Sequence, residues 1–312
     1  MLSRVANNLY WMGRYIERAE HFARYSRVLY FSTLDAPILK TYDRKFVLES
    51  ILYMAGIFDM EEISEKEVLL KIGLDLQNSN SIISNITFAR ENARGARNAI
   101  STDLWEAINK YYHLARNYPQ DTYLTTGFYD FTMMIQDQTS ILSSKIYGTL
   151  MHDGEWAIIL IGMYIERVIQ IIRIINSKLH DIYKIEQAGH TVTEMSFEWT
   201  TLLRCVEAFD MNRKFYREIP DREQVLEFLM LNPHCPRSIA YALNGIRRYE
   251  EKISRNERKD SNTIGFNIGK LVEQYRYLSF DEYKDDIYGL LNRTHDKVTQ
   301  IGSEFEKKYL SF

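Results

Sequence analysis

The strongest constraint on this chain is a short helical box that occurs twice, half a chain apart. The first copy is Gly13-Arg14-Tyr15-Ile16-Glu17-Arg18, and the second is Gly162-Met163-Tyr164-Ile165-Glu166-Arg167. Glycine, tyrosine, isoleucine, glutamate and arginine keep their relative places, and Glu166 follows Glu17 by 149 residues. This recurrence predicts an internally duplicated protein organised around two Glu-Arg boxes.

The glutamate of each box is expected to be buried where helices cross. Successive side chains on a helix point about 100° apart, so Glu17 and Arg18 serve different neighbours. Glu17 leans back over Gly13, and a glycine inside a helix indicates close approach of another segment. A buried carboxylate needs a cationic partner. The candidates are Arg24 for Glu17, Arg173 for Glu166, or an arginine from another helix.

Two interpretations of the boxes stay open at this point. In the first, each glutamate forms a buried ion pair that fixes the register of two helices and binds no ligand. In the second, the boxes line a polar pocket near the pseudo-twofold axis of the duplication.

The rarity of helix breakers predicts an all-α fold. The 312 residues include only 14 glycines and 5 prolines, and the prolines separate stretches in which apolar residues recur every three or four positions. The expected helices are 3–31, 42–58, 65–72, 82–100, one starting at 101–103, 122–150, 158–179, 197–211, one around 225–226, one starting at 238–239, 261–277 and 281–309.

Further matches extend the duplication over the whole chain. Ser81-Ile82 returns as Ser238-Ile239, and Arg90 returns as Arg247, both at an offset of 157 residues. We therefore expect a single domain, 1–312, made of two repeats, 1–150 and 151–312. Each repeat should hold about five helices, and the two should pack as one unit.

Charge and cysteine content bear on the partners and the compartment. A formal net charge of −3 supplies no basic field for nucleic acid. The most apolar run, Trp156 to Ile165, is too short to span a bilayer, and the start of the chain lacks a signal-peptide core. Cys205 and Cys235 lack the CxxC spacing, which favours a reducing compartment. We expect a cytoplasmic protein that binds neither nucleic acid nor membrane.

An arginine stripe is the second informative pattern. Arg90, Arg94 and Arg97 follow the spacing i, i+4, i+7, so three guanidinium groups share one side of a helix. They require either carboxylates from neighbouring helices or an anionic ligand such as phosphate or carboxylate. The candidate carboxylates are Glu17, Glu49 and Glu106.

The second repeat keeps only part of this stripe. Arg247 is retained, but Glu251 and Ser254 stand where the first half has Arg94 and Arg97, so an anion site is expected mainly in the first half. The candidate binding residues are Glu17, Arg18, Arg24, Arg90, Arg94, Arg97, Glu166, Arg167 and Arg247.

The sequence has no motif for several common kinds of metal, catalytic and cofactor site. Di-iron bundles use Glu-x-x-His on two helices, whereas Glu17 and His21 are four residues apart, so no metal is expected. The chain has no G-x-S-x-G, P-loop or G-x-G-x-x-G, so we assign no catalytic residue and no cofactor. The 22 tyrosines are expected to fill helix interfaces, and an exposed share of them could form a partner surface.

The motifs taken together resemble the alpha-E superfamily, a bacterial family named for a helical domain with an ER motif. The resemblance covers essentially the whole chain, with one departure, Met163 where the first box has Arg14. The motifs that carry it are Met1-Leu2-Ser3-Arg4-Val5-Ala6, Asn8-Leu9-Tyr10-Trp11, Gly13-Arg14, Glu17-Arg18-Ala19-Glu20, Ala89-Arg90-Glu91-Asn92-Ala93-Arg94, Trp105-Glu106-Ala107, Glu155-Trp156 and Glu166-Arg167.

This resemblance implies a role beside other proteins. Members are typically encoded next to circularly permuted ATP-grasp proteins and transglutaminase-like peptidases. We therefore expect an accessory, partner-binding component of a peptide or amide-bond ligation and modification system, with an anionic peptide or carboxylate as ligand. The alternatives are an enzyme that uses Glu17 and Glu166 as acid and base, with the arginine stripe holding substrate, and a purely structural scaffold. An exposed cleft holding Glu17 and Arg90 would favour the enzyme, and burial of both would favour the scaffold.

Overall fold

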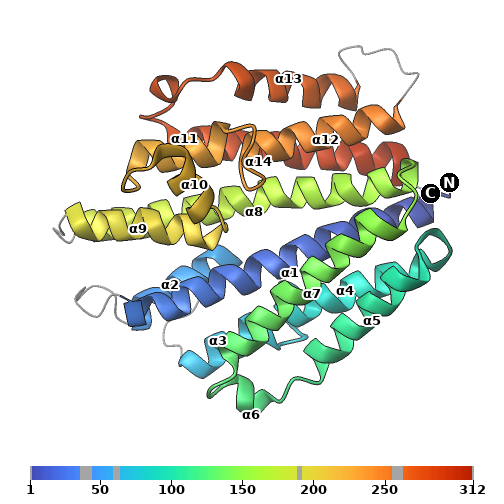
Figure 1. Ribbon diagram of the computed structural model, residues 1–312, viewed down its shortest axis with the longest axis horizontal. Helices are drawn as coiled ribbons and strands as arrows, with labels where there is room; N and C mark the ends of the chain where they lie inside the picture. The colour runs from blue at the N-terminus through green and yellow to red at the C-terminus, as the bar shows by residue number, and fades with distance from the viewer. Residues whose placement is uncertain (1, 36–43, 59–63, 188–191, 255–262, 311–312) are drawn as a thin grey trace.

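The computed structural model describes residues 2–35, 44–58, 64–187, 192–254 and 263–310, and throughout these ranges every regular element is helical (Figure 1). This confirms the predicted all-α class. The first half contains α1 (Ser3–Asp35), α2 (Arg44–Ala55), α3 (Glu65–Gly73), α4 (Ile82–Gly95), α5 (Thr102–Arg116), α6 (Gln120–Tyr123) and α7 (Phe128–Thr149), with the short turn η1 (Arg97–Ala99) after α4.

The second half has a similar number of helices. They are α8 (Gly154–Gln187), α9 (Val192–Cys205), α10 (Phe209–Tyr216), α11 (Arg222–Leu231), α12 (Ile239–Ile253), α13 (Ile264–Tyr277) and α14 (Ile287–Phe305), with the turns η2 (Phe280–Glu282) and η3 (Glu306–Leu310). The part of the chain that is described thus has seven α-helices on each side of residue 151, where about five were predicted.

Side-chain caps explain where several helices begin. The hydroxyl oxygen of Ser81 accepts from the N–H of Ser84, and that of Ser101 accepts from Leu104, which satisfies amides that have no partner within the helix. Both starts are as predicted. The predicted starts at 42 and 261 lie outside the described residues.

Two predicted helices are each divided in the structure. The stretch 122–150 splits into α6 and α7 at Gly127, whose carbonyl accepts a hydrogen bond of 3.0 Å from the Tyr118 hydroxyl. The stretch 197–211 splits into α9 and α10 at Glu207, which adopts a left-handed φ of 59°. Such a φ is uncommon for residues other than glycine and ends a helix locally. The first break coincides with a glycine, whereas the second has no such signal in the sequence. The two divisions account for the fourteen α-helices of the described residues where twelve ranges were expected.

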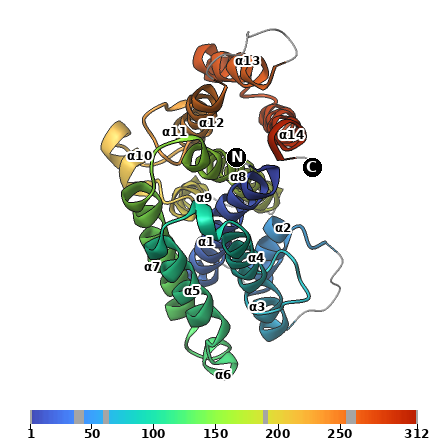
Figure 2. The same cartoon turned by 90° about the vertical axis from the view of Figure 1, so that its right-hand side faces the viewer.

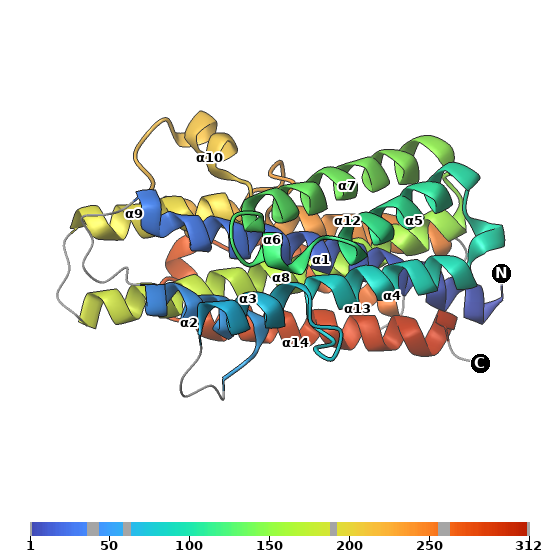
Figure 3. The same cartoon turned by 90° about the horizontal axis from the view of Figure 1, so that it is seen from below.

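The two longest helices, α1 and α8, lie side by side at the centre and run in the same direction (Figures 1 and 2). Helices α4 and α7 pack against α1, and α12 and α14 pack against α8. In Figure 2 the helices α3 to α7 lie on one side of this central pair and α11 to α14 on the other. From below, the long helices follow one common axis (Figure 3). A single cluster of buried apolar side chains includes residues of both halves.

The central position of α1 buries more than one stripe of it. One stripe consists of Leu9, Met12, Ile16, Ala19 and Ala23, which recur every three or four residues and are all fully buried. A helix that is covered on several sides also buries polar residues, and α1 buries Glu17, Glu20, His21 and Arg24. Within the described ranges, none of the helices combines the length and the apolar character needed to cross a bilayer.

Candidate functional site

The glutamate of the first box is bound by the arginine of the second box. Arg167 on α8 donates from Nε to Oε1 of Glu17 at 2.6 Å and from Nη2 to Oε2 at 3.0 Å. This is a bidentate arginine–carboxylate pair between residues 150 positions apart. Glu17 is only 3% exposed, so the predicted burial and the predicted pairing with an arginine outside its own turn are confirmed.

The glutamate of the second box is in turn bound by arginines of the first box. Arg18 donates to both carboxylate oxygens of Glu166, at 2.6 and 2.9 Å, and Arg14 adds a third hydrogen bond of 2.8 Å. Gln170, one turn along α8, donates a fourth at 2.7 Å. Met163 stands where the first box has Arg14, so Glu166 receives two guanidinium groups whereas Glu17 receives bidentate bonds from one.

Two glycines allow α1 and α8 to approach this closely. A Cβ atom on Gly13 would meet the backbone oxygen of Ile159, and a Cβ on Gly162 would meet the backbone oxygen of Tyr10. Backbone oxygens inside a helix cannot move aside as a flexible side chain can. The glycines of both boxes are therefore steric requirements of the helix crossing, as their position one turn before each glutamate predicted.

The electrostatics keep both glutamates ionised. Burial by itself raises the pKa of Glu17, but the Arg167 guanidinium outweighs it and leaves that pKa below its ordinary value. Burial opposes ionisation of Glu166 as well, and Arg18 with Arg14 lowers the pKa of this carboxyl well below its usual range. The boxes are thus buried ion pairs whose charges compensate each other across the helix interface.

A second buried polar group continues from the first box along α1. Arg24 donates from Nε to the carbonyl oxygen of Cys205 at 2.9 Å, and its Nη1 contacts Glu20 and Glu207. Arg237, in the loop before α12, contacts the same two glutamates. Arg24 was a predicted partner of Glu17, and the structure instead pairs it with Glu20. Glu20, Glu207 and Arg237 were not among the predicted site residues.

His21 lies between the two carboxylates of α1. Its Nδ1 is 2.9 Å from the carbonyl oxygen of Glu17, which can only accept, so Nδ1 carries the proton in the neutral ring. Burial lowers the pKa of His21 to about 4, against an opposing effect of Glu20. His21 occupies the position in the first box at which Gln170 donates to Glu166 in the second.

Glu17, Glu20 and His21 bring three possible metal-ligating atoms within 4.8 Å of one another. From the sequence no metal was expected, because Glu17 and His21 are four residues apart whereas di-iron bundles use a Glu-x-x-His spacing. In the structure the carboxylate of Glu17 is held by Arg167 and that of Glu20 by Arg24, so both negative charges are already compensated. A cation here would have to displace two guanidinium groups, and this donor set does not fit a resident metal.

The arginine stripe does not converge on the boxes. Arg90 donates to Asn109 at 2.8 Å and to Glu91 at 2.9 Å, and its guanidinium lies 4.7 Å from the Tyr112 ring centroid. Arg94 pairs with Glu91 at 2.6 Å and is 70% exposed. Arg97 follows the end of α4 and lies over the Trp105 ring. The predicted carboxylates of neighbouring helices are replaced by Glu91, on the same helix, and by aromatic rings of α5.

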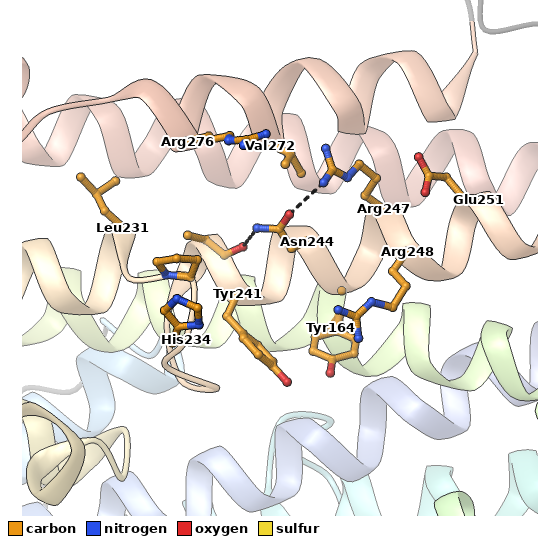
Figure 4. Close-up of a pocket in the computed structure, with 13 residues that line it drawn as sticks. Tyr164, Leu231, His234, Tyr241, Asn244, Arg247, Arg248, Glu251, Val272 and Arg276 are labelled. Carbon is orange, nitrogen blue, oxygen red and sulfur yellow. Dashed lines mark hydrogen bonds between the residues drawn. The ribbon is translucent and has the colours of Figure 1, made fainter. Parts of the chain in front are cut away.

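Arg247, the counterpart of Arg90 in sequence, lies in a pocket of about 800 Å³ between α8, α12 and α13 (Figure 4). Its guanidinium donates to Glu273 at 2.9 Å and to Asn244 at 3.2 Å. Arg248, Arg276 and Glu251 are the other charged residues that line this pocket. The anion site that the sequence favoured lay in the first half, whereas this arginine-lined pocket lies in the second.

A further polar cluster was missed because it lies within apolar sequence. Lys178 is fully buried on α8, 3.0 Å from Asp181 and 2.5 Å from Glu198 of α9. Ser50 donates to Asp181 at 2.6 Å, and the Tyr25 hydroxyl lies 2.9 Å from the hydroxyl of Ser50. The only local signal is the i, i+3 spacing of a lysine and an aspartate, which is common on solvated helices.

Comparison with known proteins links the geometry to a family. The chain is 22% identical to uncharacterized proteins of Mycobacterium bovis and Mycobacterium tuberculosis over 264 residues. The matched region is 78% of this chain but only 29% of each relative, so the chain spans less than a third of the length of these relatives. No solved structure matches the chain.

A family model whose description names a conserved ER motif covers residues 1–310. Each box contains a Glu-Arg step, and the reciprocal Glu17–Arg167 and Glu166–Arg18 pairs give this step a physical role, because each arginine neutralises the glutamate of the other box. The chain belongs to the Alpha-E family, described as a predicted alpha-helical domain with a conserved ER motif.

Proposed function

We propose that this chain is a non-catalytic, partner-binding protein of an ATP-grasp-linked system for peptide or amide-bond ligation and modification. The observation that carries the proposal is the reciprocal pairing of the two boxes. A general acid or base needs a pKa near the working pH and access to the reacting group. Glu17 and Glu166 have lowered pKa values and are buried, and arginines occupy their oxygens. They are thus suited to holding α1 against α8 rather than to proton transfer.

The relatives support the partner-binding part of the proposal. In both mycobacterial proteins a region like this chain accounts for 29% of a longer polypeptide. A helical region that is covalently joined to additional protein in one organism is a reasonable candidate for non-covalent association in another. The resemblance to the family indicates which proteins to propose as partners, an ATP-grasp ligase and a transglutaminase-like protein. The ligase would supply the ATP chemistry for which this chain has no motif.

The internal duplication is part of the same proposal. Its support is local: α4 and α12 both begin after a capping serine, Ser81 and Ser238, and both carry an arginine nine residues later. An experimental structure should superpose α1 and α4 on α8 and α12, with Glu17 over Glu166 and Arg90 over Arg247. Unrelated positions of these helices would contradict the duplication. A cytoplasmic location is also proposed, in keeping with two buried free cysteines.

The direct test is co-expression of the tagged chain with an ATP-grasp protein of the kind that the resemblance places beside members of this family. We expect the two to co-purify at micromolar concentration, and the chain alone to show no ATP turnover and no peptide cleavage. Arg94 is the exposed member of the arginine stripe, so Arg94→Ala should weaken a complex that uses an acidic partner segment. The loss should shrink at high salt, because exposed charges are screened.

A matched control separates this effect from a general change in charge. Arg213 is similarly exposed, at 68%, and pairs with Asp210 on its own helix. Arg213→Ala should leave the complex unchanged. If the chain stays unbound yet turns over ATP or cleaves peptides by itself, the enzyme alternative replaces the proposal.

A further inference from the structure

The pocket between α8, α12 and α13 has a cationic lining on two helices. Arg247 and Arg248 come from α12 and Arg276 from α13, and Glu251 is the one carboxylate among the lining residues. Glu273 receives the bond from Arg247 and lies 3.6 Å from Arg276, so it orients guanidinium groups of both helices. Figure 4 shows Arg247 and Arg276 on the side of α12 that faces α13. Three guanidinium groups therefore face two carboxylates, Glu251 and Glu273, which leaves one excess positive charge.

The same pocket has an aromatic side. The rings of Tyr164, from α8, and Tyr241, from α12, have centroids 6.2 Å apart and lie on the side of α12 that faces α8 (Figure 4). Leu231 and Val272 add apolar surface to the lining. A volume of about 800 Å³ exceeds what a lone inorganic anion needs and lies within the range of pockets for organic ligands.

A glycine on α12 makes room for the Tyr164 ring, which forms part of the pocket wall. A Cβ atom on Gly245 would lie 2.8 Å from three atoms of the Tyr164 ring, so only glycine lets the ring lie against α12. Gly245 follows the capping Ser238 by seven residues, and Phe88 follows the capping Ser81 by the same number. In the first half Phe88 packs on the box tyrosine, Tyr15, with ring centroids 5.2 Å apart.

The box beside the pocket holds the aromatic side in place. The Arg167 guanidinium lies 5.0 Å from the centroid of the Tyr164 ring while it binds Glu17. Tyr164 is therefore anchored by a cation–π contact to a residue that is itself fixed by a buried ion pair. A ring that is held in this way loses little conformational entropy when a ligand packs against it.

We propose that this pocket binds a small organic anion, whose carboxylate or phosphate is held by Arg248 beside the Tyr164 ring, within the positive field of Arg247 and Arg276, and whose apolar or aromatic group lies against Tyr164 and Tyr241. The proposal goes beyond the proposed function, because the site requires no protein partner. A carboxylate at the end of a peptide and an organic phosphate share this chemistry.

The test is calorimetric titration of the full-length protein at low ionic strength with two probes, N-acetyl-phenylalanyl-glutamate and phenyl phosphate. At least one should bind, and competition between them identifies the preferred source of the anion. The double variant Arg248→Ala, Arg276→Ala removes two exposed guanidinium groups and should weaken binding at least tenfold. Tyr241→Ala should weaken both aromatic probes while leaving weak binding of acetate or inorganic phosphate unchanged.

The control carries the same change in charge elsewhere. Arg213→Ala with Arg293→Ala removes two other exposed arginines, 68% and 61% exposed, from α10 and α14, and should bind the probes like the unaltered protein. Failure of both probes to bind, equal losses in the two double variants, or equal affinity for inorganic phosphate and the aromatic anions would overturn the proposal. Co-purification of the Arg248, Arg276 double variant with the ATP-grasp protein tests the proposed function separately.

Discussion

Glu17 on α1 is held in bidentate fashion by Arg167 on α8, and Glu166 on α8 is held by Arg18 on α1. Because the two helices run in the same direction, equivalent residues of the boxes lie at the same level. Each box therefore supplies the counter-charge that the other requires. Removing one glutamate leaves a largely buried arginine without its counter-charge. Truncating a residue of these pairs should therefore destabilise the protein far more than truncating a residue of an exposed ion pair.

Truncation of a box glutamate should destabilise the fold strongly. Glu17→Ala leaves the Arg167 guanidinium without its carboxylate, and we expect a loss of roughly 3–5 kcal/mol in the free energy of unfolding. Glu91→Ala is the matched control, because Glu91 pairs with the exposed Arg94 and should cost at most about 1 kcal/mol. Urea denaturation measures both. An unchanged unfolding midpoint for Glu17→Ala would refute the structural role of the pair.

A methyl group at the helix crossing should be harmful despite the preference of helices for alanine. Gly13→Ala places a Cβ against the backbone oxygen of Ile159, so α1 and α8 must separate and the melting temperature should fall. Gly269, inside α13, has nothing within 4 Å of the equivalent position. Gly269→Ala should stabilise the protein by up to about 1 kcal/mol through helix propensity alone. Thermal melting of both variants gives the comparison, and a stabilised Gly13→Ala would contradict the close crossing.

The buried histidine should make stability depend on pH. Burial depresses the pKa of His21 from its ordinary value of 6.5 to about 4, so the unfolded chain binds a proton at higher pH than the folded one. The stabilisation is complete above pH 6.5 and is lost as the pH falls towards 4. Glu20, with a pKa of about 2 against an ordinary 4.5, extends the loss to lower pH.

His21→Gln should flatten the part of this profile between pH 6.5 and 4.5, because glutamine does not titrate and already serves at the equivalent place, as Gln170. Melting temperatures measured across this range test the prediction. His113→Gln is the control, since His113 is exposed on α5. A slope in His21→Gln equal to that of the unaltered protein would show that another group is responsible.

Removing the buried lysine alone should destabilise the protein, whereas neutralising its carboxyl neighbours as well should restore most of the lost stability. Burial raises the pKa of Glu198 to about 8, so at neutral pH the charge that depends on Lys178 is that of Asp181. Lys178→Met leaves this buried carboxylate without a cation and should cost roughly 3–5 kcal/mol. Adding Asp181→Asn and Glu198→Gln removes the uncompensated charge and should recover most of this loss, since a buried ion pair contributes little net stability over neutral groups of similar shape. Equal unfolding free energies for the single and the triple variant would argue against a buried ion cluster.

The amino-acid sequence determined the helices and much of the local chemistry of the boxes. The spacing of apolar residues and the scarcity of breakers were sufficient for the all-α class, and Ser81 and Ser101 marked two helix starts through their hydroxyl groups. The repeated Gly-x-x-x-Glu spacing was sufficient to predict burial of Glu17 at a close crossing. These features depend on residues within a turn or two of each other, where helix geometry alone decides which side chains meet.

The tertiary structure decided which charges meet. Arg24 was a local candidate for Glu17, yet the partner is Arg167, 150 residues away, because the direction and register of α8 against α1 place it there. The same packing turns Arg90 towards the rings of α5 and lays the Tyr164 ring against Gly245. Contacts between distant segments depend on how whole helices pack, and a single sequence without its fold does not specify that packing.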